Sequence, residues 1–560
     1  MAKNQLPFPN TNSSPDIDQS VSTKPKKFVL EFDAQGIPIL SKQRIILAVI
    51  ALCIAIFLAS LDGTIVATAL PKITNNFNAA NSAHWLVTAN LLANTCFQPL
   101  FGKISDIFGR KETLILAIFI FEAGSAISGI VNSINLLIFS RALTGIGAAG
   151  IVVMVQIVVS EMVPIRERGK YTGFIGLAFG MASVVGPLLG GVFTDNVGYR
   201  WCFFINLPVG LVAGVVIAFL VKTKKPQGSV ISKIKRFDFI GALLLIAGLV
   251  MFIIGLSFGG TEYPWSSATV LCLLIGGVLF LVLYILYDLK LAKEPILPLD
   301  LFYRRNLWSS VCAQFFMSFG LYGIIYIIPS YDTAVHNASA SDSGISLLPF
   351  VLTMVVFSIL GGVGITRTGK YIIMFRVGTA SMALGIGLLA TINQNTKKVL
   401  TIFYLALCGI GCGLSMQSFL ICAQAAVPRT FIAGATSVIA FSRILSGAIG
   451  ITLSTLVQKS VLTPKIKALI QKYPDNIDYI QKSIKNTSLI HSLPMGEDLK
   501  YSLINIYVSS ITKAFIMFCA VLCLSFAITL ISRHIPFEQA ADPAKKIADS
   551  PPSNNNSGTI

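Results

Sequence analysis

Apolar runs of about twenty residues alternate with short polar segments along almost the whole chain. A helix needs about 20 predominantly apolar residues to cross the hydrocarbon core of a bilayer. The pattern therefore predicts an all-α polytopic membrane protein with about fourteen transmembrane helices. The predicted spans are residues 45–67, 85–102, 113–132, 135–157, 171–193, 203–221, 239–258, 268–288, 309–329, 345–365, 374–392, 400–420, 433–456 and 510–532.

The composition supports this interpretation. Of 560 residues, 54% are hydrophobic and only 12% are charged, about half the charged fraction of a soluble domain. The net charge of +18 is concentrated in short segments between apolar runs, which membrane topology explains better than nucleic-acid binding. Polar residues dominate both ends, and we expect disordered tails over residues 1–42 and 534–560. The start lacks the apolar stretch of a cleavable signal peptide.

Basic residues predict the orientation. The segments that follow even-numbered spans are basic, so we place them, and both termini, in the cytoplasm. The sequons at Asn337 and Asn486 then fall on the other side, where glycosylation is possible. The lysine-containing segment 458–509 also falls there, against the trend, and we expect short surface helices in its middle.

The segment "GKISDIFGRK" between the second and third spans combines a tight turn with charge. It can act as a positive anchor that sets topology, or as a charge latch that breaks and reforms as two halves of the protein move. Its candidate residues are Gly102, Asp106, Gly109, Arg110 and Lys111.

The segment "GLAFGMASVVGPLLGG" in the fifth span is rich in small residues. Glycines allow helices to pack closely, and a proline inside a helix allows it to bend. Any packed helix pair could use such glycines, but the Gly-Pro pair followed by Gly-Gly is more particular. The residues singled out are Gly180, Gly186, Pro187, Gly190 and Gly191.

Ionisable residues at membrane depth are few, and such residues usually mark ion or substrate paths. Desolvation of Glu122 favours its neutral form, so it is our first candidate for a proton carrier. Arg141 nearby would favour the charged form, so a change in their separation would couple protonation to movement. Asp62 is a gate or a relay, or it is simply solvated at a helix end. The alternative role of Glu122 is that of a structural partner. Arg443 is a candidate partner in the second half.

In combination, these motifs resemble the major facilitator superfamily, specifically its fourteen-spanning drug:proton antiporter branch. "LDGTIVATALP" resembles the helix-one motif, Arg110 closes the loop signature, and "RWCFFINLP" is similar to fungal members. Arg141 and Gly186-Pro187 match the motifs of helices four and five. One departure is Glu161, where relatives more often carry aspartate.

The resemblance implies two six-helix bundles, residues 43–222 and 301–533, that rock around a central cavity. Residues 223–300 would form two extra helices. It also implies proton-driven export of small, cationic or amphipathic toxic compounds by a monomer, without a cofactor, in the plasma membrane. Possible cavity residues are Gln98, Tyr322, Gln417 and Arg443.

Other functions stay open at this point. Relatives on the same fold include vacuolar importers of basic amino acids and siderophore carriers, and a non-transporting nutrient sensor is a further alternative. We do not expect an enzyme, because the sequence contains no phosphate-binding loop, metal constellation or nucleophile elbow.

Overall fold

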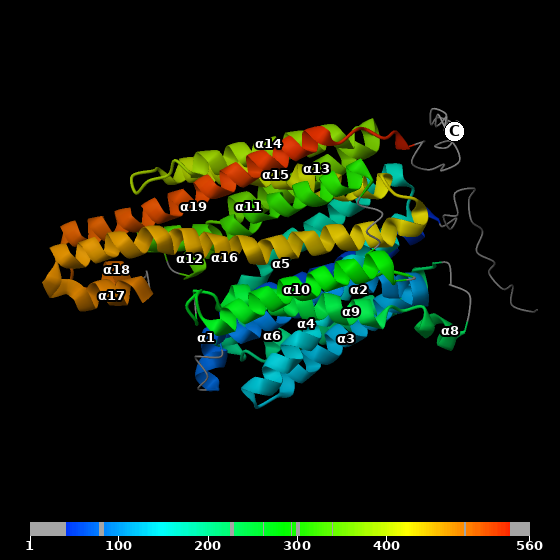
Figure 1. Cartoon of the computed structure of the whole chain (residues 1–560), viewed down its shortest axis with the longest axis horizontal. Helices are drawn as coiled ribbons and strands as arrows, with labels where there is room; N and C mark the ends of the chain where they lie inside the picture. The colour runs from blue at the N-terminus through cyan, green and yellow to red at the C-terminus, as the bar shows by residue number, and fades with distance from the viewer. Residues whose placement is uncertain are drawn as a thin grey trace, which may run out of the picture.

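The computed structural model describes residues 41–77, 83–223, 229–260, 262–292, 294–297, 303–338, 340–485 and 489–537. Almost all of these residues are helical (Figure 1). The described part of the chain has one isolated β-bridge, between Gly259 and Tyr263, and no β-sheet. The prediction of an all-α fold is confirmed.

Seven helices form the first half of the molecule. They are α1 (Lys42–Asn76), α2 (Ala83–Phe108), α3 (Arg110–Ile130), α4 (Ile134–Met162), α5 (Ile165–Asn196), α6 (Trp201–Phe204) and α7 (Asn206–Leu220). Gly109 separates α2 from α3 with a φ of 114°, a conformation that glycine adopts without a steric penalty. The short α6 and the following α7 together make one crossing.

The second half follows a short linker and a helical hairpin. The linker and hairpin contain α8 (Val230–Lys235), α9 (Phe239–Phe258) and α10 (Ala268–Lys290). The second half contains α11 (Arg305–His336), α12 (Ala340–Ile345), α13 (Leu348–Thr368), α14 (Tyr371–Leu389), α15 (Lys398–Ala425), α16 (Ile432–Lys472), α17 (Ile477–Lys485), α18 (Leu489–Ser492) and α19 (Glu497–Ile531).

Thirteen helical segments in the described part of the chain are long and apolar enough to cross a membrane. Helix α2 is not among them, because Asn90, Asn94 and Gln98 make its sequence more polar. It nevertheless lies inside the first half, where it packs against α4. Adding α2 makes the structure consistent with about fourteen crossings, as the hydropathy pattern predicts.

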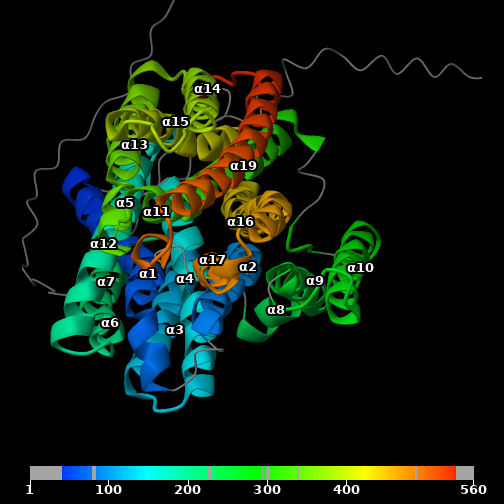
Figure 2. The same cartoon turned by 90° about the vertical axis from the view of Figure 1, so that its left-hand side faces the viewer.

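Each half has its own apolar core. The halves touch mainly along two helix pairs, α5 with α13 and α2 with α16, with smaller contacts of α5 with α15 and of α4 with α16. The hairpin of α9 and α10 lies outside this arrangement, beside α2 and α16 (Figure 2), and α9 contacts both. This is the arrangement that the resemblance implies: two six-helix bundles with two extra helices.

Glu294, in the segment after α10, joins the hairpin to the first half. Its carboxylate lies 2.7 Å from Arg236 Nε, just before α9, and 3.1 Å from Lys103 Nζ on α2. The hydrogen bond from Arg236 and the charge of Lys103 lower the pKa of the Glu294 carboxyl group. One carboxylate therefore connects three segments that are far apart in the sequence.

The described residues of the segment 458–509 are mostly helical. Helix α16 continues to Lys472, α17 and α18 follow, and α19 begins at Glu497, so α16 and α19 extend beyond the other helices (Figure 1). The Nε2 atom of His491 lies 3.0 Å from the carbonyl oxygen of Ala334, which ties α18 to the end of α11. Tyr507 donates a hydrogen bond to the Ser483 carbonyl oxygen at 3.1 Å.

Candidate functional site

A buried ion pair lies inside the first half. Arg141 on α4 and Asp62 on α1 are each 1% exposed. Both carboxylate oxygens of Asp62 lie 2.8 Å from Nη1 of Arg141. An isolated charge at this depth would be costly, so each residue makes the other tolerable in the apolar interior. The alternative that Asp62 is solvated at a helix end is wrong, since α1 continues to Asn76.

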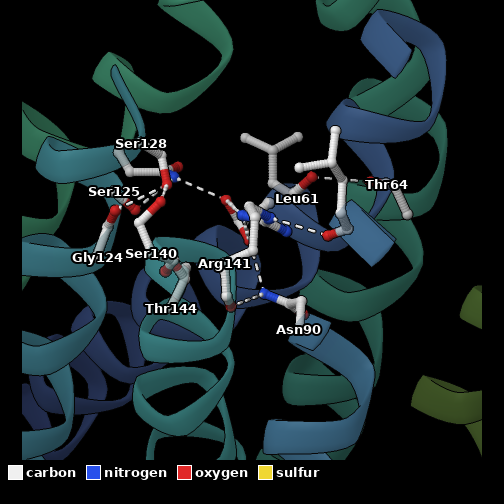
Figure 3. A network of polar contacts seen from close by, with 12 residues as sticks. Leu61, Thr64, Asn90, Gly124, Ser125, Ser128, Ser140, Arg141 and Thr144 are labelled. Carbon is white, nitrogen blue, oxygen red and sulfur yellow. Dashed lines mark hydrogen bonds and ion pairs between the residues drawn. The ribbon is translucent and has the colours of Figure 1, made fainter. Parts of the chain in front are cut away.

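Two amides and one aromatic ring complete the surroundings of this pair, and Figure 3 shows the amide of Asn90 beside Arg141. The Nδ2 atom of Asn206 on α7 donates to Asp62 at 3.3 Å, and Nδ2 of Asn90 on α2 lies 3.5 Å from the other carboxylate oxygen. Asn90 also donates to the Arg141 carbonyl oxygen at 3.3 Å. The guanidinium carbon of Arg141 lies 5.7 Å from the ring centre of Phe203, within the range of a cation–π contact. Side chains from α2, α4 and α7 therefore meet at the Asp62 carboxylate of α1, and α6 adds the ring beside the guanidinium.

Hydroxyl groups extend the network into the contact between α3 and α4. Ser125 accepts a hydrogen bond from Asn206 at 3.2 Å, and the hydroxyls of Ser128 and Ser140 lie 2.8 Å apart. Sequence reasoning missed Asn90, Asn206 and these serines. The available signal was the presence of amides and hydroxyls inside apolar runs.

Glu122 lies apart from the ion pair, on the seam between α3 and α7. The Glu122 carboxylate occupies the space that a Cβ atom at Gly210 would fill, so only glycine fits at position 210 in this conformation. Both carboxylate oxygens are enclosed, and neither has a hydrogen-bond partner among the described residues. In this conformation Arg141 therefore pairs with Asp62 and not with Glu122, the acid beside which we expected it.

The residues between α2 and α3 form a compact charge cluster. Arg110 pairs with Asp106 on α2 and with Glu161 at the end of α4, whose Oε1 lies 2.6 Å from Nε. The Arg110 guanidinium also donates to Ser105 at 2.8 Å. Lys111 follows at the start of α3. The structure therefore brings Asp106, Arg110 and Glu161 together at the ends of three helices.

Glycines at this same end permit close contact between the two halves. Gly102 of α2 packs directly against Ser437 of α16. A Cβ atom at Gly169 of α5 would lie 2.6 Å from the carbonyl oxygen of Gly362 on α13, closer than Cβ atoms normally approach. Gly173 and Gly180 face α13 as well. Sequence reasoning identified only part of this row, because Gly169 and Gly173 precede the recognised motif.

The later residues of the α5 motif have different surroundings. Gly186 packs against Thr64 of α1, and the Thr64 hydroxyl donates to the Ala182 carbonyl oxygen at 3.1 Å. Gly190 is buried, whereas a Cβ at Gly191 would meet nothing within 4 Å. Pro187 lies inside the helix. The glycines of this motif therefore allow α5 to pack closely against α1 as well as against the second half.

Hydrogen bonds reinforce the contact between the halves at the end that carries Arg110. Nη1 of the buried Arg168 on α5 donates to Oε1 of Gln424 on α15 at 3.0 Å. Gln424 in turn donates to Thr436 on α16 at 3.0 Å, and the Lys170 amide donates to the Thr366 hydroxyl at 3.2 Å. We call these the closing contacts. The sequence offered no signal for the pairing of Arg168 with an amide on a distant helix.

A small cavity of about 30 Å³ lies between the halves, with room for no more than a few water molecules. The guanidinium carbon of Arg443 lies 5.6 Å from the ring centre of Phe179 across this cavity, and Gln417 donates to Ser358 at 3.1 Å. Its main polar and aromatic lining residues are Gln156, Thr172, Phe179, Gln314, Gln417 and Arg443. No acidic residue lines it among those that the structure describes.

The remaining predicted residues lie elsewhere. Gln98 is buried on α2 and donates to Asn94 at 2.9 Å, and it is not among the described lining residues of the cavity. Tyr322 on α11 packs against Gly447 and is not among the described lining residues of the cavity either. Asn337 is exposed at the end of α11, with a left-handed backbone (φ 52°). Asn486 lies outside the described residues.

Two helical bundles that enclose a polar cavity, with a buried ion pair in one of them, define a multi-pass membrane protein of the transporter type. The sequence model of the Major Facilitator Superfamily matches residues 52–451. The chain belongs to this superfamily.

Comparisons with individual proteins agree with this assignment. The chain is 35% identical over 492 residues to efflux pump dotC of Dothistroma septosporum, covering 87% of this chain and 84% of that protein. It is 34% identical to the multidrug transporter protein MdtP of Bacillus subtilis, covering 80% and 82%. Among solved structures, the proton:xylose symporter XylE is similar with a TM-score of 0.56 at 14% identity, covering 90% of this chain and 100% of that chain.

Proposed function

We propose that this protein exports small amphipathic toxic compounds in exchange for protons by alternating access. The buried pair of Asp62 and Arg141 is the observation that carries the proposal. Its carboxylate contacts side chains from several helices of the first half, so a change in its charge reaches all of them. The names of the relatives, efflux pumps and a multidrug transporter, support export as the direction of transport.

The proposed coupling step is the protonation of Asp62. A neutral carboxylic acid no longer neutralises Arg141, so the guanidinium needs new partners and the packing of α1 against α4 changes. Because Asp62 is almost fully buried, proton exchange requires an opening that this conformation does not provide. In this proposal Asp62 carries the transported proton, and Glu122 is a second, less connected candidate because it has no cationic partner among the described residues.

The closing contacts support an orientation and a conformational state. They lie at the end that holds the basic residues Lys103, Arg110 and Lys170, which the positive-inside rule places in the cytoplasm. In this proposal the conformation is closed toward the cytoplasm, the Arg110 cluster stabilises that closure, and both termini are cytoplasmic. The protein acts as a monomer in the plasma membrane, with the vacuolar membrane as the alternative.

The lining of the central cavity favours one class of cargo. Arg443 contributes a positive charge whose Nε atom has no hydrogen-bond partner among the described residues, and no described lining residue is acidic. A cationic cargo would be repelled here, whereas neutral or anionic amphipathic molecules would find amides, a cation and the Phe179 ring. This argues against an importer of basic amino acids and narrows the cargo to uncharged or anionic amphiphiles.

Proteoliposomes with an imposed pH gradient test the proposal. Uptake of anionic, neutral and cationic amphipathic dyes is compared with uptake of labelled lysine, for the wild type and for Asp62→Asn, Glu122→Gln and Arg443→Gln. We expect gradient-driven transport of the anionic and neutral dyes, its loss in Asp62→Asn, and weaker transport of the anionic dye in Arg443→Gln. Gradient-driven lysine transport, or a fully active Asp62→Asn, would refute the proposal.

A further inference from the structure

One large hollow in the first half does not face the central cavity. It is a groove of about 550 Å³ between α1 and α5. Its walls are mostly apolar, and several of the side chains are exposed, including Ile50 at 51% and Met181 at 47%. The apolar lining residues include Val49, Ile50, Cys53, Phe57, Phe174 and Met181.

The groove and the central cavity lie on different faces of the same two helices. Ile56 of α1 and Phe179 of α5 line the cavity, whereas their near neighbours Phe57 and Ala178 line the groove. The groove therefore opens toward the bilayer and is separated from the cavity by the packed wall of α1 and α5. Its volume exceeds that of the cavity many times, so it can accept a hydrocarbon chain without any movement.

One end of the groove is basic. Lys170, which is exposed at the start of α5, lines this end together with Tyr171. The first turn of α1 adds Lys42 and Arg44, a few residues before the groove residue Ile46. Glu167 lies one turn before Lys170, so the charge there is mixed but remains net positive.

We propose that this groove binds one anionic phospholipid from the leaflet at the basic end, with an acyl chain along α1 and α5 and the phosphate at Lys170. The apolar walls match a hydrocarbon chain, and Lys170 lies where the walls end, which matches a headgroup. A cationic amphiphile would be repelled by the same lysine. The inference does not depend on the cargo or on proton coupling, because it uses only the groove and its position in the bilayer.

Fluorescence quenching by brominated lipids tests this site in the full-length protein. The four native tryptophans are replaced by phenylalanine, and a single reporter is introduced as Ile50→Trp in the groove. The matched control is Ile275→Trp on α10, which is 65% exposed but lies outside the groove. Both variants are reconstituted in mixtures of phosphatidylglycerol and phosphatidylcholine in which one lipid or the other is brominated.

We expect the groove reporter to prefer phosphatidylglycerol by about fivefold, the factor that one basic residue near anionic lipid typically contributes. Lys170→Gln should abolish most of this preference, while Lys290→Gln, an exposed lysine at the end of α10, should not. The Ile275→Trp reporter should show no preference. Equal preference at both reporters, or no effect of Lys170→Gln, would overturn the proposal.

Native mass spectrometry provides a second measurement that does not depend on the tryptophan-free background. Wild type and Lys290→Gln should retain one phospholipid of anionic mass after detergent exchange, and Lys170→Gln should retain much less. Retention of a zwitterionic lipid, of a non-lipid molecule, or of equal amounts in all three proteins would contradict the assignment of this occupant.

Discussion

Replacing Gly169 by alanine adds one methyl group where α5 touches α13. The new Cβ atom would lie 2.6 Å from the carbonyl oxygen of Gly362 and 3.2 Å from Cβ of Ile365, whereas ordinary van der Waals contact begins at 3.4 Å. The carbonyl oxygen belongs to the backbone of a packed helix, so no side-chain rotation can relieve the overlap. The two helices must separate at the end that carries the closing contacts.

The free-energy cost of the added methyl group follows from the cost of overpacking, which is typically about 1–3 kcal/mol. This cost applies only to the conformation in which α5 and α13 touch here. It therefore shifts the equilibrium toward the conformation that is open at this end by about 5–150-fold. Alanine also favours helix over glycine by up to about 1 kcal/mol, but this gain is the same in every conformation.

Gly191→Ala is the matched control, because it lies on the same helix and a Cβ there would meet nothing within 4 Å. It gains the same helix propensity without the overlap. The assay measures the labelling rate of a single cysteine, Thr436→Cys, by a membrane-impermeant maleimide in a background without the ten native cysteines. Thr436 is fully buried beside the closing contacts. The cysteine removes the hydrogen bond from Gln424 in every variant alike, so differences in labelling rate report the opening of the remaining closing contacts.

We expect Gly169→Ala to increase the labelling rate by about fivefold or more and Gly191→Ala to leave it unchanged. Equal rates in the two variants would refute the reasoning. So would wild-type transport by Gly169→Ala, because a conformational equilibrium shifted this far should slow one half of the transport cycle.

Three further predictions follow from other contacts. Asp62→Asn leaves Arg141 buried without a counter-charge and should lower the melting temperature in detergent, since removing one member of a buried pair costs about 3–5 kcal/mol in soluble proteins. The double variant Asp62→Asn/Arg141→Gln should recover stability without recovering transport. A double variant as unstable as the single variant would contradict this explanation. Glu294→Gln should increase hydrogen exchange around Arg236. Because the pKa of Glu294 is lowered in the folded state, the stabilisation by its carboxylate is fully present above the ordinary glutamate pKa and is lost as pH falls through the folded pKa. The exchange rates of wild type and variant should therefore converge in acid. Glu122→Gln should fold and keep most of its transport activity, and its complete inactivation would make Glu122 the proton carrier.

Much of the fold could be predicted because the bilayer imposes a simple requirement. Each crossing needs a long apolar helix, so hydropathy located the spans, including α2, whose amides lower its hydropathy. The segment 458–509 was harder, since its helices lie beyond the apolar runs and are held by tertiary contacts such as that of His491 with Ala334. Helix propensity alone does not specify such contacts.

The sequence by itself determined which groups the site can use. Charges at membrane depth are so costly that Asp62, Glu122 and Arg141 stood out without any structure. Only the tertiary structure decided how they pair. Residues 62 and 141 lie on different helices, and the rotation of α4 about its axis determines whether Arg141 faces Asp62 or Glu122. That rotation depends on the packing of many small side chains between α3 and α4, which no local pattern in the sequence encodes.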